Sequence, residues 1–305
     1  MRHDLDLDAL AVLDAIDRRG GFAAAAEALH RAPSSVTYAV QKLEERLGVE
    51  LFDRRGHRAR LTPAGEALLR EGRALLALAD EVSRHVRRVA SGWEAELRIA
   101  VGDLIPFERV LTLCEAFHRT SAHTRLRLST EVLGGTWDAL ASGRADLVIG
   151  APGDGPPGGG YATHFLGEVE FVFAVAPHHP LAEADEPLSA DLIRRHRAVA
   201  AADSSRGLPP RTVGLLTGQP VLTVPDMHTK VLAQLRGLGV GYLPTHLIRD
   251  HLAAGRLRVK STEDGPAHRH RLYYAWRSRS TGQALAWFLE RLCGEPGMDW
   301  FGPAP

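Results

Sequence analysis

The sequence predicts a multidomain α+β chain that combines a small N-terminal helical domain, a long linker helix and a larger C-terminal α/β domain. Three short segments before residue 48 carry apolar residues at helical spacing. A seven-residue apolar repeat then runs from about residue 63 to residue 90, and strand and helix patterns alternate from residue 97 onward. The length of 305 residues agrees with two or so domains.

Composition and charge narrow the class of protein. The 37 Lys and Arg residues balance 37 Asp and Glu residues, so net charge alone does not indicate a nucleic-acid partner. Between residues 30 and 60, however, seven basic residues stand against four acidic ones, a local excess that suits a DNA-binding face. The 2 cysteines, Cys114 and Cys293, form no CxxC pair, which argues against a disulfide framework and a thiolate metal site.

The start of the chain, MRHDLDLDAL, is acidic and contains no apolar leader segment. No apolar run is long enough to cross a bilayer. We therefore expect a cytoplasmic protein that has no membrane partner.

Two short helices are expected first. Asp6 can cap a helix whose apolar residues recur at i, i+3, i+4 and i+7, and Gly20-Gly21 ends it. A second, alanine-rich helix follows from Phe22 to Leu29 with the same spacing. Because alanines allow two helices to approach closely, this pair is typical of a helix-turn-helix.

The third helix is expected to begin at Pro33, whose fixed φ suits the first turn. Its buried stripe comprises Val36, Val40, Leu43 and Leu47. The opposite face, near the helix start, offers hydrogen-bonding side chains without a carboxylate: Ser34, Ser35, Thr37, Tyr38, Gln41 and Lys42. Such a face could enter a DNA major groove and read base edges. The alternative is an ordinary solvated helix face.

A basic hairpin is expected after this helix. Leu51-Phe52 leads into a turn at Gly56 that carries a group of basic side chains, namely Arg54, Arg55, His57, Arg58 and Arg60. A turn of this kind suits contacts to phosphates or to the minor groove, as the wing of a winged helix-turn-helix does. The alternative is a solvated turn.

A long helix follows, with Thr62 as its cap and Pro63 in its first position. The seam repeats every seven residues at Leu68, Leu75, Val82 and Val89, with Gly72, Ala79 and Val86 at companion positions. This pattern predicts a coiled coil that pairs two copies of the chain. Packing of the helix against its own C-terminal domain is the alternative.

The remainder alternates between strands and helices. Strands are expected over 97–101, 125–132, 146–149, 168–175 and 271–276, and a further strand follows Gly237. Helices are expected over 107–118, 136–141 and 283–292, with one more opening at 187–189. The initial β-α-β-α-β order implies parallel strands.

The N-terminal segments together resemble the LysR-type transcriptional regulators. The match runs without a gap over the first sixty-odd residues and is carried by Phe22–Ala26, Val36-Thr37, Gln41–Glu44, Leu47-Gly48, Leu51–Arg54 and Leu61–Gly65. It continues less tightly at Gly143–Ile149, His179–Ala182 and Gly237–Pro244. The family usually has Ser at Gly21 and Ser-Gln at Ala32-Pro33. Because that Gln often touches DNA, no operator sequence can be carried over.

The resemblance implies a domain plan and a set of partners. A winged helix-turn-helix would occupy 1–62, a linker helix 63–92 and an effector-binding domain 96–305. That domain would be two-lobed and similar to periplasmic binding proteins, with lobe 1 at about 96–166 and 268–305 and lobe 2 at about 167–267. The implied partners are an inverted repeat in double-stranded DNA, a small-molecule effector, a second copy through the linker helix, a homotetramer and RNA polymerase.

Ligands in such folds bind beyond the carboxyl ends of strands and at helix starts. The candidate ligand-binding residues are Gly102, Asp103, Leu104, Glu131, Gly135, Thr136, Asp203, Ser204, His228, Tyr242 and Thr245. Each of them could instead be a structural loop residue. The two acidic candidates, Asp103 and Glu131, favour donor ligands such as phenols over carboxylates.

A narrower resemblance, to the YhaJ-like branch, implies aromatic, quinol-like signals. The stretches that carry it are Asp14–Gly20, Pro33–Glu44, Gly92–Glu94 and Thr130–Leu133 with Trp137.

No catalytic, metal or cofactor site is expected. The glycines at 237, 239 and 241 follow a helix and lead into a strand, the wrong order for a dinucleotide fingerprint. The paired histidines have no clear third ligand, and no GxSxG motif is present. The remaining alternative function is an enzyme or carrier that uses the two-lobed domain and keeps the N-terminal module only for dimerisation.

Overall fold

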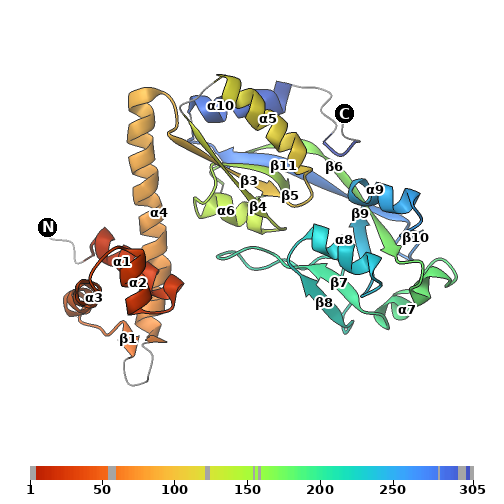
Figure 1. Cartoon of the computed structure of the whole chain (residues 1–305), viewed down its shortest axis with the longest axis horizontal. Helices are drawn as coiled ribbons and strands as arrows, with labels where there is room; N and C mark the ends of the chain where they lie inside the picture. The colour runs from red at the N-terminus through yellow and green to blue at the C-terminus, as the bar shows by residue number, and fades with distance from the viewer. Residues whose placement is uncertain are drawn as a thin grey trace. The chain divides into compact units, whose positions relative to one another are not determined.

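The structure is a computed structural model that describes residues 5–53, 60–120, 124–153, 155–156, 159–280, 282–294 and 300–302. The chain divides into two compact units, Met1–Val86 and Arg87–Pro305. Figure 1 shows the elements of both units. No helix in the described ranges is long and apolar enough to span a membrane.

The first unit contains the expected helix-turn-helix. Its helices are α1 (Leu7–Arg19), α2 (Phe22–Ala28) and α3 (Pro33–Leu47), and the first part of α4 (Pro63–Ser91) completes it. As expected, Asp6 caps α1 by accepting a hydrogen bond from the Asp8 N–H at 3.1 Å. Thr62 caps α4, because its hydroxyl accepts from the Gly65 N–H at 3.1 Å.

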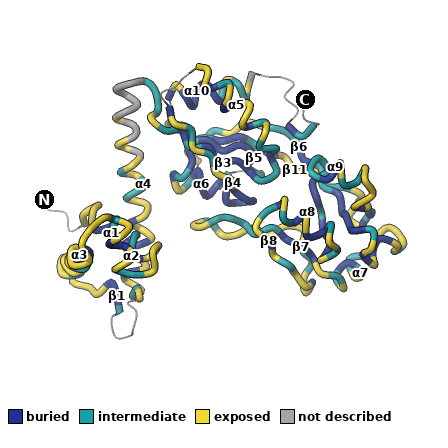
Figure 2. The backbone as a smooth tube through the Cα atoms, in the orientation of Figure 1, coloured by how far each residue is buried: buried dark blue, intermediate teal, exposed yellow. Residues whose placement is uncertain are grey.

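The core of this unit is the apolar stripe of each helix. Val36, Val40 and Leu43 of α3 are buried against α1 and α2, and Leu47 is partly buried beside them. Close packing of α1 and α2 relies on Ala25 and Ala26, both fully buried. Burial of one helix face leaves the other in solvent, as the exposed colour of α3 in Figure 2 shows.

The base of the expected hairpin is present. Strands β1 (Phe52–Asp53) and β2 (Arg60–Leu61) pair antiparallel, while residues 54–59 lie outside the described residues. The Glu44 carboxylate of α3 accepts hydrogen bonds from the N–H groups of Leu51 at 2.8 Å and Phe52 at 3.2 Å. The end of the third helix is thereby tied to the start of the hairpin.

The second unit has two lobes that share two long strands. In the first lobe, β3 (Glu96–Gly102) lies between β4 (Arg125–Glu131) and β5 (Leu147–Pro152), all parallel, with α5 (Phe107–Thr120), α6 (Gly135–Ala141) and α10 (Gln283–Gly294). The shared strands are β6 (Tyr161–Val175) and β11 (Ala267–Arg277), which pair antiparallel along their lengths.

The second lobe is built on the far half of β6, where β9 (Gly241–Pro244) and β10 (Arg258–Lys260) pair antiparallel. It also contains the parallel pair β7 (Ala198–Ala201) and β8 (Val221–Val224). Its helices are α7 (Ala190–Arg194), α8 (Met227–Leu235) and α9 (Thr245–Ala253), with a 3₁₀ turn at Pro180–Ala182.

The sheet is mixed, whereas the sequence pattern implied parallel strands. The expectation is confirmed for β3, β4 and β5, but β11 pairs antiparallel with β5. Strand β6 also begins earlier than expected, at Tyr161, and Thr163, His164 and Phe165 within it are exposed. This half lacks a buried alternating face, so the sequence contains no apolar signal for it.

Candidate DNA-binding surface and ligand cavity

The polar face of α3 is open to solvent. Ser34, Ser35, Gln41 and Lys42 are exposed, and the Tyr38 side chain is 63% exposed. The Lys42 ammonium lies 5.7 Å from the centroid of the Tyr38 ring, so a cation and a phenol are presented together. Thr37 is only partly exposed, and its hydroxyl donates to the Pro33 carbonyl at 3.0 Å. Most of the polar face of α3 that we predict to contact base edges, called the reading face below, is therefore accessible to DNA.

Three other predicted DNA-binding residues, Arg54, Arg55 and Arg58, lie outside the described residues. The flanking strand β2 is described, and its Arg60 is exposed. Since Glu44 holds the start of the hairpin to α3, the reading face and the base of the hairpin belong to one packed unit.

An exposed apolar stripe runs along α4. Leu75, Leu78, Val82 and Val86 are 41%, 56%, 55% and 62% exposed, respectively. The predicted seam is wrong at its beginning, because Leu68 packs against the core of the first unit. A Cβ on Gly72 would lie 3.0 Å from the Leu10 side chain, so Gly72 faces α1. The side chain of Val89 is not among those that the structure describes. The stripe that remains available to a partner starts at Leu75.

A cavity of about 420 Å³ lies between the two lobes of the second unit. Its first-lobe wall includes Gly102, Leu104 and Leu133, and the shared strands contribute Phe171 and Leu272. The second lobe adds mostly apolar side chains: Leu188, Ile193, Val213, Leu215, Leu216, Met227 and Val240. A cavity of this size and lining suits a small molecule with an apolar body.

Five of the predicted ligand-binding residues line this cavity: Gly102, Asp103, Leu104, Thr136 and Tyr242. Six do not: Glu131, Gly135, Asp203, Ser204, His228 and Thr245. These six are not among the residues that line the cavity, so their role in ligand binding stays a prediction. Five of them contact other parts of the protein, and His228 is exposed on α8.

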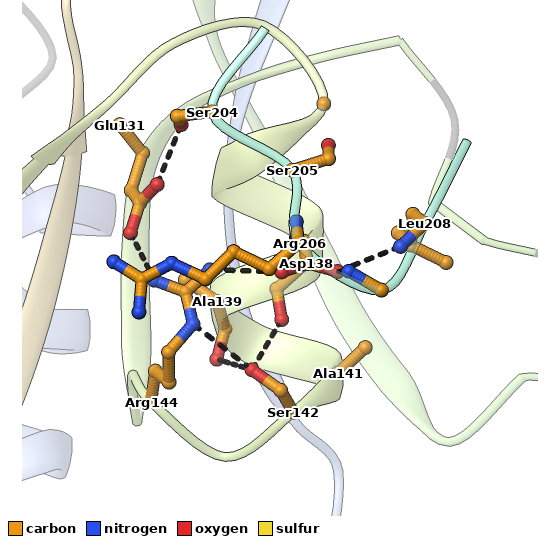
Figure 3. A network of polar contacts seen from close by, with 12 residues as sticks. Glu131, Asp138, Ala139, Ala141, Ser142, Arg144, Ser204, Ser205, Arg206 and Leu208 are labelled. Carbon is orange, nitrogen blue, oxygen red and sulfur yellow. Dashed lines mark hydrogen bonds and ion pairs between the residues drawn. The ribbon is translucent and has the colours of Figure 1, made fainter. Parts of the chain in front are cut away.

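Glu131 and Ser204 belong to a network that joins the lobes, shown in Figure 3. The Ser204 hydroxyl donates to the Glu131 carboxylate at 2.6 Å and accepts from the Val132 N–H at 2.9 Å. Glu131 also pairs with Arg144. A Cβ on Gly135 would lie only 1.8 Å from the Ser204 Oγ, so Gly135 serves this close approach.

Asp138 is the centre of the same network (Figure 3). Its carboxylate accepts from the backbone N–H groups of Gly207 and Leu208, each at 2.9 Å, and of Arg206 at 3.1 Å. Arg144 donates to it at 2.9 Å. Burial acts to raise the pKa of Asp138, but these hydrogen bonds outweigh it and hold the pKa below its ordinary value. The segment after β7 is therefore anchored to α6.

Asp203 and Thr245 have similar structural roles. Asp203 accepts from the N–H groups of Arg211 at 2.7 Å and Gly134 at 3.1 Å. The Thr245 hydroxyl donates to the Glu170 carbonyl at 3.2 Å. Their positions in loops did not predict that these side chains form hydrogen bonds within the protein instead of facing the cavity.

Asp103 remains on the cavity wall and links the lobes. It accepts a hydrogen bond from the Met227 N–H, the first of α8, at 2.9 Å. Burial raises the pKa of Asp103 to about 6, even though this hydrogen bond acts in the opposite direction. The carboxyl can therefore change its protonation state not far below neutral pH.

The sequence analysis missed Lys230, which also lines the cavity. Burial lowers the pKa of Lys230 to about 8. A signal was present, because Met227, Lys230, Val231 and Gln234 fall at i, i+3, i+4 and i+7 on the buried face of α8. A lysine within such a stripe is unusual. Across the described residues, no group of three or more His, Cys, Asp or Glu side chains could hold a metal ion.

Comparison with known proteins decides the family. Residues 7–66 match the bacterial regulatory helix-turn-helix proteins of the lysR family, and residues 90–294 match the LysR substrate binding domain. The chain belongs to the LysR family. Its relatives include two Escherichia coli K12 proteins. The uncharacterized HTH-type transcriptional regulator YeeY is 40% identical over 94% of this chain and 92% of its own length. The probable regulator YhaJ is 42% identical over 94% and 96%, respectively.

The fold also matches solved full-length LysR structures. Full-length CbnR complexed with its target DNA aligns with a TM-score of 0.58 over 95% of this chain and 99% of CbnR, at 20% identity. Because its two parts match the two LysR family models and its relatives are transcriptional regulators, the chain is a DNA-binding transcriptional regulator with an effector-binding domain. The matched families and relatives are regulators and not enzymes, so the enzymatic alternative is set aside.

Proposed function

We propose that this LysR protein reads an inverted repeat in double-stranded DNA as a homodimer, and that a small aromatic molecule in the inter-lobe cavity controls this binding. The observation that carries the proposal is the exposed polar face of α3. Its Ser, Tyr and Gln side chains suit base edges in the major groove. The proposed site of action is the cytoplasm, where bacterial promoters are found.

In the proposal, the basic turn contacts the DNA backbone. Arg54, Arg55 and Arg58 would neutralise phosphates, a contribution that does not depend on base sequence. Arg55→Ala should therefore weaken binding to all sequences and reduce its salt dependence, whereas Gln41→Ala should weaken binding chiefly to the operator.

The exposed stripe of α4 supports the proposed dimer. Leu75, Leu78, Val82 and Val86 form an apolar strip that a second copy of the helix could cover. Two reading helices would then meet two half-sites. Assembly of a tetramer and contact with RNA polymerase also belong to the proposal, and both rest on the family resemblance.

The volume and apolar lining of the cavity support a small effector with an apolar body. A ligand can alter DNA binding only if it prefers one arrangement of the protein over another. Cavity walls contributed by both lobes provide a means, since closure of the lobes would improve ligand contacts.

Footprinting of the DNA upstream of this protein's own gene, with and without candidate small aromatic molecules, tests this function. We expect protection of an inverted repeat, with boundaries or affinity that change when an effector is added. Absence of any protected site at protein concentrations that coat unrelated DNA would contradict the proposal.

A further inference from the structure

Two lysines of the second unit are buried to the same degree but have different surroundings. Lys230 and Lys260 are each 8% exposed. The Lys260 ammonium donates to the Ala184 carbonyl at 2.8 Å and the Ala182 carbonyl at 3.4 Å, and it pairs with Glu186 at 2.9 Å. Lys260 is therefore a structural lysine whose charge is compensated within the fold.

Lys230 has no comparable direct contacts. Throughout the described residues, its ammonium forms no hydrogen bond and no ion pair within 4.0 Å, although it lies on the cavity wall. The charge that acts on it is Asp103, whose carboxylate accepts from the Met227 N–H instead. Because the Lys230 ammonium has no acceptor within the described protein, its N–H groups must find their acceptors in whatever fills the cavity.

The surrounding backbone leaves room for the ammonium. A Cβ on Gly241 would lie 3.6 Å from the Lys230 Nζ. Gly241 also has φ +153°, which side-chain-bearing residues rarely adopt. Gly241 and Lys230 both line the cavity.

His268 and His270 also line the wall, and burial lowers the pKa of His270, which disfavours its charged form. Two other polar side chains of the wall already use their donors. The Thr136 hydroxyl donates to the Leu133 carbonyl at 3.0 Å, and the Gln219 amide donates to the His196 carbonyl at 2.9 Å.

The two hydroxyls at Tyr242 and Thr262 are also occupied. Thr262 donates to the Gly265 carbonyl at 3.0 Å, so the Tyr242 hydroxyl must donate to Thr262, which lies 2.9 Å away. Compared with these side chains, Lys230 offers the cavity unused N–H donors and a positive charge.

We propose that the effector carries a carboxylate on an apolar body, and that the Lys230 ammonium binds this carboxylate inside the cavity. This inference rests on the proposed function, because it names the effector class of the same cavity. It also replaces the expected preference for phenols over carboxylates, which relied on Asp103 and Glu131, because only Asp103 lines the cavity and Glu131 pairs with Arg144. Three acidic residues, Asp103, Glu263 and Asp264, also line the cavity, so the carboxylate must lie toward Lys230 and away from them. The raised pKa of Asp103 eases the approach of an anion.

The test uses the full-length chain and matched probes of equal shape. Benzoate, benzamide and phenol form one set, phenylacetate and phenylacetamide a second, and hexanoate and hexanamide a third. Thermal shift and calorimetry at pH 7 would be compared for wild type, Lys230→Met and the control Lys260→Met.

We expect at least one carboxylate to bind at least tenfold more tightly than its neutral partner, and Lys230→Met to weaken that binding at least tenfold. Lys260→Met should retain the carboxylate affinity and lower the melting temperature. Without ligand, Lys230→Met should melt at the same or a higher temperature, because it removes a largely buried charge that has no hydrogen bond or ion pair among the described residues.

Four results would overturn the inference. They are binding of no carboxylate in the panel, equal binding of a neutral partner or phenol, undiminished carboxylate binding by Lys230→Met, and a melting-temperature loss in Lys230→Met as large as that in Lys260→Met. Footprinting of the wild type separates the two proposals. A protected operator without carboxylate binding removes only the role of Lys230, whereas carboxylate binding without any protected DNA removes the proposed function.

Discussion

The Asp103 carboxylate accepts a hydrogen bond from the Met227 N–H at 2.9 Å, and this contact joins the end of β3 in one lobe to the first turn of α8 in the other. A carboxylate is favourable at a helix N-terminus, but burial opposes its ionisation. Both residues line the cavity, and Met227 belongs to the same helix as Lys230. A change in the charge of Asp103 should therefore alter the strength of a hydrogen bond that joins the two lobes.

The first prediction concerns the pH dependence of stability. The pKa of Asp103 is raised from 3.8 to about 6, so its stabilising contribution is present below pH 4 and is lost as pH rises through 6. Relative to Asp103→Asn, the wild type should lose roughly 2–3 kcal/mol between pH 4 and pH 7. Urea unfolding of both proteins across this range measures the difference.

A matched control is Asp226→Asn at the cap of α8. The Thr229 N–H donates to Asp226 at 2.7 Å, and hydrogen bonds with Thr229 lower the pKa of this carboxyl. Its contribution should be present above pH 4 and lost as pH falls, the opposite direction. A difference between wild type and Asp103→Asn that stays constant with pH would rule out the buried ionisation of Asp103.

The second prediction concerns Asp138, whose carboxylate accepts from the N–H groups of residues 206, 207 and 208. Asp138→Ala should destabilise the protein by about 2–4 kcal/mol, because it leaves these backbone donors without their acceptor and Arg144 without one of its two carboxylate partners. Hydrogen exchange at residues 206–208 should accelerate. The exposed Asp185→Ala is the control, and equal exchange in the two variants would mean that Asp138 does not anchor this segment.

The third prediction concerns the exposed stripe of α4. Val82→Glu places a charge where the proposed dimer would bury an apolar side chain, so the variant should shift toward monomer. Ser83→Glu adds the same charge at the neighbouring exposed position and should leave the molar mass unchanged. Light scattering after size exclusion gives the mass. If the Val82→Glu protein remains a dimer, the dimer interface does not include this stripe of α4.

Helical periodicity and caps made much of the fold predictable. The spacing of Val36, Val40 and Leu43 located the reading helix, and Asp6 and Thr62 marked two helix starts that the structure confirms. These signals are local, since each depends on residues within a few turns. Strand β7, with the sequence AVAA, was missed because four small apolar residues show no period.

The cavity was less predictable because side-chain direction is a tertiary property. Asp203 and Ser204 follow β7 as expected, but they turn toward Gly134 and Glu131 of the other lobe. Lys230 was passed over in a helix, although its place in an apolar stripe distinguished it. Buried polar residues on an otherwise apolar face are therefore better indicators of this cavity than loop position alone.

The most direct test is an anisotropy titration of the footprinted operator with wild type, Gln41→Ala, Tyr38→Ala and the control Val49→Ala. Val49 is 44% exposed and lies outside α3, so its variant should bind as the wild type does. Removal of a base contact costs about 1–3 kcal/mol, so Gln41→Ala or Tyr38→Ala should weaken operator binding roughly 5- to 150-fold, with melting temperatures unchanged. Operator affinity equal to that of the wild type in both variants would contradict a reading role for α3.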